Sequence, residues 1–136
     1  MTVRLIKKIN KKKINNLKGQ IFKYISKKDR YYREFGEVYF NEIKKNHTKG
    51  WNLHKKNFCL IYCIQGKVLF HFVDCKNKEK KILLSARDSS ILEIPPKIWF
   101  SFKAINQSAI IVNFLNKPHK DSEVLKKNKI KNYFIK

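Results

Sequence analysis

The segment FCLIYCIQGKVLFHFVD, residues 58–74, decides the fold class. Its first half, 58–64, is a short and nearly continuous apolar run rich in β-forming residues, which is typical of a strand buried on both faces. Gln65 and Gly66 form a tight turn, and a second strand follows over 67–74. We predict that these two strands pair as a β-hairpin.

Further short strands are expected on both sides of this segment. They are predicted over 20–25, 37–43, 48–54, 81–84, 90–94, 99–105 and 108–115. Short strands at regular spacing, separated by turn signals, predict a single all-β sandwich or barrel. The 136 residues suffice for one domain with one modest core.

The two ends of the chain are basic and weakly patterned. Residues 1–16 are predicted to be a loose arm or a short edge strand. In the C-terminal segment, 118–136, the stretch 118–126 predicts one or two helical turns.

The charge balance favours anionic partners. Thirty-two basic residues against 10 acidic residues give a formal net charge of +22. Lysine greatly outnumbers arginine, and isoleucine and asparagine are frequent, which is the composition that an AT-rich coding sequence gives without selection for function. Two interpretations therefore stay open: a solvated lysine surface, or a true anion-binding role.

Cysteine usage and hydropathy indicate the compartment. The three cysteines are an odd number without framework spacing, and Cys59 and Cys63 lie in an apolar run, as buried free thiols do. The basic N-terminus is not followed by the apolar region of a signal peptide. The longest apolar run, 58–64, is far shorter than the roughly 20 residues of a membrane helix. We expect a soluble cytoplasmic protein without a membrane partner.

Five pieces of sequence, taken in order, resemble one family. They are FGEVYF at 35–40, KGWNLHKK at 49–56, GKV at 66–68, IPPKIWFSFK at 94–103, and Asn113 with PHKDSEV at 118–124. The chain resembles the dTDP-4-dehydrorhamnose 3,5-epimerase family, cupins that act on nucleotide sugars, and most of all its short single-domain members. The resemblance implies a single cupin jelly-roll β-barrel over 1–136, a nucleotide-sugar ligand and a homodimer, in which a second copy covers the edge strands of an open barrel.

A metal site is not expected. A metal-binding cupin carries two histidines one residue apart, a carboxylate a few residues on, and a third histidine on a later strand. The corresponding positions here are Asn52, His54, Cys59 and Phe100, so one imidazole is left. Asparagine is a poor ligand for transition metals and phenylalanine is none. We predict no metal and no other cofactor.

The classical catalytic residues of the family are missing. Its Arg-Gly-Leu-His strand, which ends in the histidine that removes a sugar proton, aligns with residues 49–52. Lys49 then replaces the arginine that holds phosphate, and Asn52 replaces the base, a role that an amide cannot fill. A catalytic lysine of the family falls near Cys59, and no counterpart of its acidic tyrosine is found around Asn113.

His54 is the candidate base. It lies two residues after Asn52, so both side chains should face the same interior. It is either a displaced catalytic base or a hydrogen-bonded structural or ligand-contact histidine. The residues predicted to bind substrate are Lys49, Asn52, Lys56, Cys59, Trp99, Phe100 and Asn113. Aromatic side chains in this set also serve to fill a core, and exposed lysines also serve as solvated surface.

Three functions remain open from the sequence. The first is a metal-independent epimerase or isomerase that acts on a dTDP-4-keto-6-deoxy sugar or a similar compound in the biosynthesis of cell-surface polysaccharide. The alternative is a non-catalytic cupin that binds a nucleotide sugar or glycan. The third is a basic nucleic-acid binder, against which the lack of a recognition helix, a zinc finger or an RRM-like aromatic motif argues.

Overall fold

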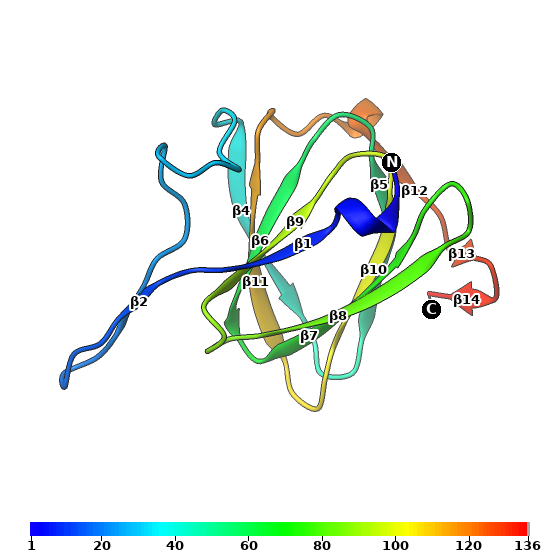
Figure 1. Cartoon of the computed structure of the whole chain (residues 1–136). Helices are drawn as coiled ribbons and strands as arrows, with labels where there is room; N and C mark the ends of the chain where they lie inside the picture. The colour runs from blue at the N-terminus through cyan, green and yellow to red at the C-terminus, as the bar shows by residue number, and fades with distance from the viewer. Residues whose placement is uncertain (136) are drawn as a thin grey trace.

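The protein is built from two antiparallel five-stranded sheets that face each other (Figure 1). This computed structural model describes residues 1–135. The first sheet has the order β1 (Lys7–Asn10), β9 (Ser90–Ile94), β6 (Cys59–Gln65), β11 (Ala109–Leu115) and β4 (Glu37–Ile43). The second has the order β12 (Val124–Lys126), β5 (Thr48–His54), β10 (Trp99–Ala104), β7 (Lys67–Val73) and β8 (Glu79–Ser85). The predicted all-β class is confirmed, and the arrangement is consistent with a cupin.

Four very short strands complete the sheet structure. The pair β2 (Lys13–Ile14) and β3 (Ile21–Phe22) forms a hairpin that projects from the body, and β13 (Lys129–Ile130) pairs with β14 (Tyr133–Phe134) near the C-terminus (Figure 1). Two single-turn 3-10 helices, η1 (Val3–Leu5) and η2 (Asp121–Glu123), lie close to the two ends of the chain. Among the described residues, no helix is long and apolar enough to cross a membrane.

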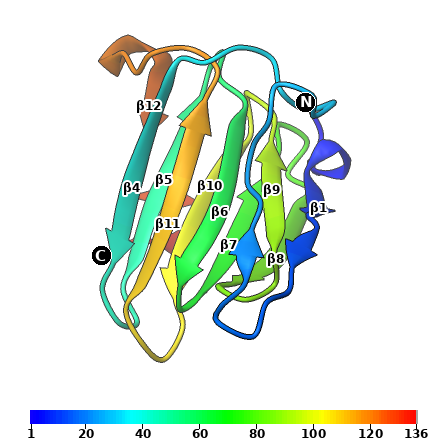
Figure 2. The ribbon, with the colours of Figure 1, turned by 90° about the vertical axis from the view of Figure 1, so that its left-hand side faces the viewer.

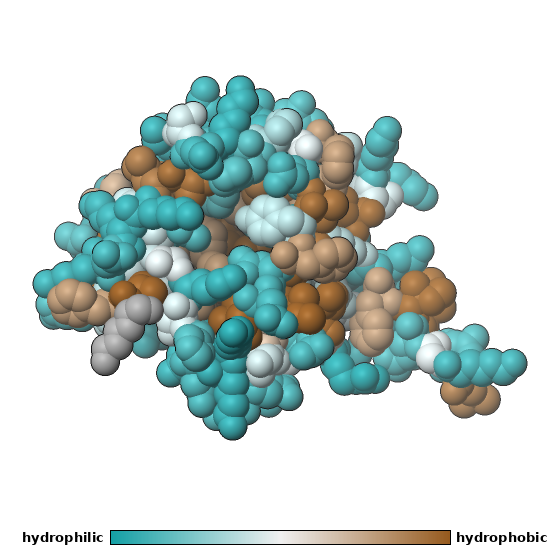
Figure 3. Space-filling view, turned by 180° about the vertical axis from the view of Figure 1, so that it is seen from behind, coloured by the Kyte–Doolittle hydropathy of each residue, from teal (hydrophilic) through white to brown (hydrophobic). Residues whose placement is uncertain are grey.

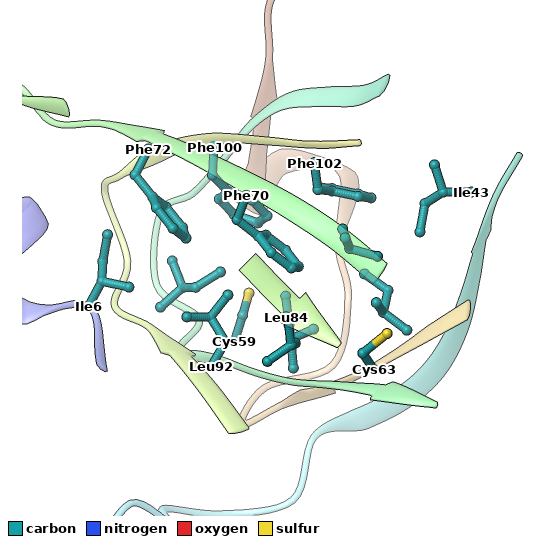
Figure 4. Packing of buried hydrophobic residues seen from close by; sticks show 14 of the residues in the cluster. Ile6, Ile43, Cys59, Cys63, Phe70, Phe72, Leu84, Leu92, Phe100 and Phe102 are labelled. Carbon is teal, nitrogen blue, oxygen red and sulfur yellow. The ribbon is translucent and has the colours of Figure 1, made fainter. Parts of the chain in front are cut away.

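The core lies between the two sheets. Alternate side chains of each strand point inward, because successive residues of a strand face opposite sides. Cys59 and Cys63 of β6, with Leu92 of β9, meet Phe70 and other phenylalanines of the second sheet (Figure 4). All three cysteines are free, and Cys59 and Cys63 are buried, as predicted.

The predicted hairpin of residues 58–74 is wrong. β6 belongs to the first sheet and β7 to the second, so Gly66 is the point at which the chain crosses between them. Gly66 has a φ of 79°, and an added Cβ would lie 2.8 Å from the carbonyl oxygen of Ser108. Each strand is hydrogen-bonded on both sides within its own sheet, β6 to β9 and β11 and β7 to β8 and β10, so neither has a free edge for the other.

The predicted C-terminal helical segment over 118–126 is also wrong. Only Asp121–Glu123 makes a single 3-10 turn, and Val124–Lys126 then pairs with β5 as strand β12. The short apolar pair Val124 and Leu125 adds to an open sheet edge, which satisfies more backbone groups than an isolated helical turn would.

Candidate functional site

A polar cluster lies at the end of the interior where β5 finishes and β6 begins. It is formed by His54 of β5, Tyr39 of β4, Cys59 of β6 and Asn113 of β11, with Glu123 of η2 beside them. Strand pairing explains why these side chains lie close together, since Asn113 of β11 lies opposite Tyr39 of β4 on one side and Ile61 of β6 on the other. β12 pairs with β5 at the Val124–His54 position and so brings Glu123 to the same end.

His54 and Glu123 form a buried pair. The His54 Nδ1 atom lies 2.9 Å from Oε2 of Glu123, and both side chains are less than a tenth exposed. The backbone N–H groups of Lys56 and Asn57 donate to Oε1 of Glu123 at 3.1 and 2.9 Å. Burial alone would raise the pKa of Glu123, but these N–H groups and the imidazole together lower it. The ionised carboxylate accepts from Nδ1–H, which leaves Nε2 of a neutral His54 as the proton-accepting nitrogen.

Tyr39 and Asn113 form a second pair, which is partly buried. The Asn113 Nδ2 group lies 3.0 Å from the Tyr39 hydroxyl, and the Asn113 Oδ1 atom has no partner among the described residues. Burial raises the pKa of Tyr39 to about 12, so the phenol is protonated near neutral pH and able to donate a hydrogen bond. The tyrosine was missed from the sequence, although its position two residues before Asn41 and four before the buried Ile43 places it on the inner face of β4.

Cys59 is not a nucleophile in this environment. It is fully buried, and burial raises its thiol pKa to about 12, which the nearby Asn113 amide only partly opposes. The Cys59 side chain is therefore a neutral thiol that packs against the other residues of the cluster. Phe100 lies on the other side, with its ring stacked 6.2 Å from the His54 ring, centroid to centroid.

Four predicted site residues lie elsewhere. Trp99 packs on the outer face of the second sheet with Trp51, Val73 and Ile130. Lys49 lies further down β5, where its ammonium group contacts Oδ1 of Asn41 at 2.6 Å and the carbonyl of Glu42 at 2.9 Å.

Asn52 is the third of these four, half-buried beside a small hollow that Asn41 and Lys49 also line. Lys56, the fourth, has an exposed side chain, while its backbone N–H holds Glu123. Of the predicted site residues, the structure thus brings together His54, Cys59, Phe100 and Asn113.

Among residues 1–135, no three His, Cys, Asp or Glu side chains are grouped as a metal ion requires. The cluster contains a histidine held by a carboxylate near a protonated tyrosine, an arrangement that can transfer protons.

A family model described as FdtA: WxcM-like, C-terminal matches residues 5–134. The chain belongs to this family. Among curated proteins, no sequence matches the chain. The similarity to nucleotide-sugar cupins that the sequence predicted is therefore confirmed at the level of the family.

Solved structures share the fold. A dTDP sugar isomerase from Desulfovibrio desulfuricans G20 has a TM-score of 0.86 and 21% identity, over 92% of this chain and 85% of that one. QdtA, a sugar 3,4-ketoisomerase from Thermoanaerobacterium thermosaccharolyticum solved with TDP, has a TM-score of 0.82 and 20% identity, over 93% and 90%. A dTDP-4-dehydrorhamnose 3,5-epimerase from Elizabethkingia anophelis NUHP1 has a TM-score of 0.78 and 14% identity, over 94% and 78%. At such identities the likeness shows the fold.

Proposed function

We propose that the protein is an isomerase or epimerase of a dTDP-4-keto-6-deoxy sugar, with His54 as the base. The observation that carries this proposal is the buried His54–Glu123 pair, which lies beside Tyr39 in a fold shared with dTDP-sugar isomerases and epimerases. The resemblance alone suggests the setting, the biosynthesis of cell-surface polysaccharide. The proposed cytoplasmic location rests on the cysteine usage and hydropathy of the sequence.

The chemistry follows from the two pairs. Nε2 of His54 takes the proton from a carbon next to the sugar's keto group, and the electron pair of that C–H bond forms an enolate. The Tyr39 hydroxyl, which is protonated near neutral pH, donates a hydrogen bond to the developing oxyanion. Return of the proton to C4, together with transfer of the O3 hydroxyl proton to O4, moves the keto group to C3. Delivery of a proton to the original carbon by a donor on the opposite face instead inverts that centre.

The first test is proton–deuterium exchange on dTDP-4-keto-6-deoxyglucose in D₂O, followed by NMR. We expect deuterium to appear at C3 when wild-type protein is added. A 3-keto product then indicates isomerisation, and an inverted C3 or C5 centre indicates epimerisation.

Two observations favour the non-catalytic alternative. Asn52 occupies the position of the family's base, and Cys59 is a neutral buried thiol where a catalytic lysine is expected. Saturable binding of the same compound without any exchange would support a binding protein. The absence of both binding and exchange would contradict both functions for this sugar.

We also propose a homodimer formed through the outer face of the first sheet. Val38 and Phe40 of β4 and Ile64 of β6 point outward and are 45%, 72% and 46% exposed. They line a hollow of about 490 Å³ beside Tyr24 of the chain that follows β3, and β4 is the edge strand of its sheet. A Phe40→Asp variant should elute as a monomer in size-exclusion chromatography with light scattering, while a monomeric wild type would contradict the dimer.

A further inference from the structure

One short segment, residues 55–58 between β5 and β6, holds both the carboxylate and the backbone of Glu123. The N–H groups of Lys56 and Asn57 donate to the Oε1 atom at 3.1 and 2.9 Å, and the N–H of Lys55 donates to the backbone carbonyl at 2.9 Å. The chain that follows β11 reaches Glu123 across the end of the molecule where β6 begins (Figure 2). The position of Glu123 therefore depends on how this chain is joined to the short segment.

Two asparagines make that junction. The Oδ1 atom of Asn57 accepts from the backbone N–H of Lys117 at 2.8 Å, and the Oδ1 atom of Asn116 accepts from the N–H of Phe58, also at 2.8 Å. Asn57 is fully buried, and its Nδ2 group has no partner among residues 1–135. A buried donor without a partner destabilises the fold, so the contribution of this amide is its acceptor oxygen.

Within the described chain, the other polar side-chain contacts of residues 117–122 are exposed. They are the contacts of Lys117 with Glu34, of His119 with Asp121, and of the His119 N–H with Glu37. Exposed pairs of this kind contribute little to stability. Asn57 is thus the buried side chain that fixes the start of this stretch, while β12 fixes its end by pairing Val124 with His54.

We propose that Asn57 is a positioning residue for the base: its side chain holds the chain from 117 to 123 so that Glu123 stays in contact with His54 and with two N–H donors. The catalytic consequence rests on the proposed function. The two N–H···O distances lie in the upper half of the usual range, so a displacement of about half an ångström would break them. Burial would then raise the pKa of Glu123, and a protonated carboxyl no longer selects the Nδ1–H tautomer of His54.

The other titratable groups around Glu123 do not replace these donors. On the inner side, Tyr39 and Cys59 are neutral, because burial raises the pKa of each to about 12. The charged groups on the outer side are Lys55, Lys56, Lys117, Lys120 and Glu34. Their side chains are exposed, so solvent and salt screen their effect on the carboxylate.

NMR of His54 and Glu123 in the full chain tests the proposal without relying on turnover. The test variant is Asn57→Ala, which removes the acceptor oxygen but keeps both N–H donors. The matched control is Asn116→Ala, which removes a bond of the same kind and length between the same two stretches of chain. A loss of stability alone would lower Tm in both variants alike.

We expect the imidazole nitrogen shifts to show the Nδ1–H tautomer of His54 in the wild type and the control, and both tautomers in Asn57→Ala. The carboxyl carbon of Glu123 should titrate at higher pH in Asn57→Ala than in the wild type. Deuterium exchange on dTDP-4-keto-6-deoxyglucose should slow about tenfold in Asn57→Ala and about twofold at most in the control.

Two further variants keep the test decisive. Asn57→Asp retains an oxygen opposite the Lys117 N–H and should restore the wild-type tautomer. If Asn57→Ala does not fold, Asn57→Ser, whose hydroxyl is too short to reach that N–H, takes its place with the same expected shifts.

The outcomes separate this proposal from the proposed function. If Asn57→Ala keeps the wild-type tautomer and titration, or if Asn116→Ala changes them equally, the positioning role is wrong, while exchange by the wild type still supports the function. If Asn57→Ala changes the tautomer but the wild type catalyses no exchange, the positioning role stands and the proposed function is wrong.

Discussion

Two of the histidine–carboxylate pairs among residues 1–135 differ in where they face. The inner pair, His54 and Glu123, has a nitrogen–oxygen distance of 2.9 Å, and the outer pair, His71 and Glu79, has one of 2.7 Å. In both, partners that bond the carboxylate lower its pKa. By local geometry alone, each pair would pass as a catalytic histidine with its orienting acid.

The two pairs differ in the residues that surround them. The inner pair lies beside Tyr39, Cys59 and Asn113 at one end of the space between the sheets. The outer pair lies on the other face of the second sheet, under the ring of Tyr133 at 4.5 Å and beside Lys131, which bonds Glu79 at 2.7 Å. The face of the molecule in Figure 3, seen from behind, is largely hydrophilic with apolar side chains in patches. The comparison shows that the contact geometry alone does not distinguish the two pairs, whereas the polar side chains around His54 do.

Replacement of the two histidines should give the largest contrast. His54→Gln is expected to slow deuterium exchange about 10²–10⁴-fold, because it removes the proton-accepting nitrogen. His71→Gln should stay within twofold of the wild type. Deuterium exchange rates, measured by NMR on both variants, test this prediction. Thermal melts of the same two variants serve as the control. Equal losses would show that the two pairs do not differ in function.

Replacement of the two carboxylates should give a smaller contrast. Glu123→Gln keeps the shape but removes the charge that selects the Nδ1–H tautomer of His54, so exchange should fall about 10–100-fold. Glu79→Gln, which disturbs the outer pair in the same way, should leave the exchange rate unchanged. If Glu123→Gln retains the wild-type rate, the orienting role is contradicted.

Two tyrosines extend the comparison. Tyr39→Phe removes one hydrogen-bond donor from the inner cluster and should reduce kcat about tenfold, in keeping with the loss of roughly 1–1.5 kcal/mol. Tyr133→Phe beside Glu79 should not change kcat. Steady-state kinetics at saturating substrate decides this, and an unaltered kcat in Tyr39→Phe would remove Tyr39 from the mechanism.

Acid titration should weaken the outer pair gradually. The side chains of Lys131 and His71 lower the pKa of Glu79 to about 2, below the value of about 4.3 in an unfolded chain. A lowered folded-state pKa stabilises the fold above pH 4.3, and this contribution fades as the pH falls from about 4.3 towards 2. The decline of Tm over this range should be shallower in Glu79→Gln than in the wild type; parallel curves would contradict the coupling.

The smallest effect is expected for Lys131→Ala. This lysine bonds Glu79 at the surface, and exposed ion pairs contribute at most about 1 kcal/mol. Urea unfolding should therefore show a loss below that value, and the loss should shrink further at 1 M salt. A loss of several kcal/mol would mean that the C-terminal strands β13 and β14 depend on this contact.

The sequence alone predicted the all-β class, most strand positions, the buried free thiols and the choice of His54. These follow from local rules, because side-chain alternation and turn residues act over neighbouring positions. The placement of His54 two residues after Asn52 already assigned it to an inner face. The family resemblance was likewise carried by short motifs in order.

Tertiary structure decided the rest. The partition of β6 and β7 into opposite sheets depends on which inner face each strand buries, and no local signal at Gly66 reports that. Glu123 reaches His54 across 69 residues of sequence because β12 adds to the free edge of β5, and Tyr39 meets Asn113 across 74 residues through sheet pairing. The sequence determined the strands and singled out His54, whereas long-range pairing, which sums weak contributions from the whole chain, brought Glu123, Tyr39 and Asn113 together with it.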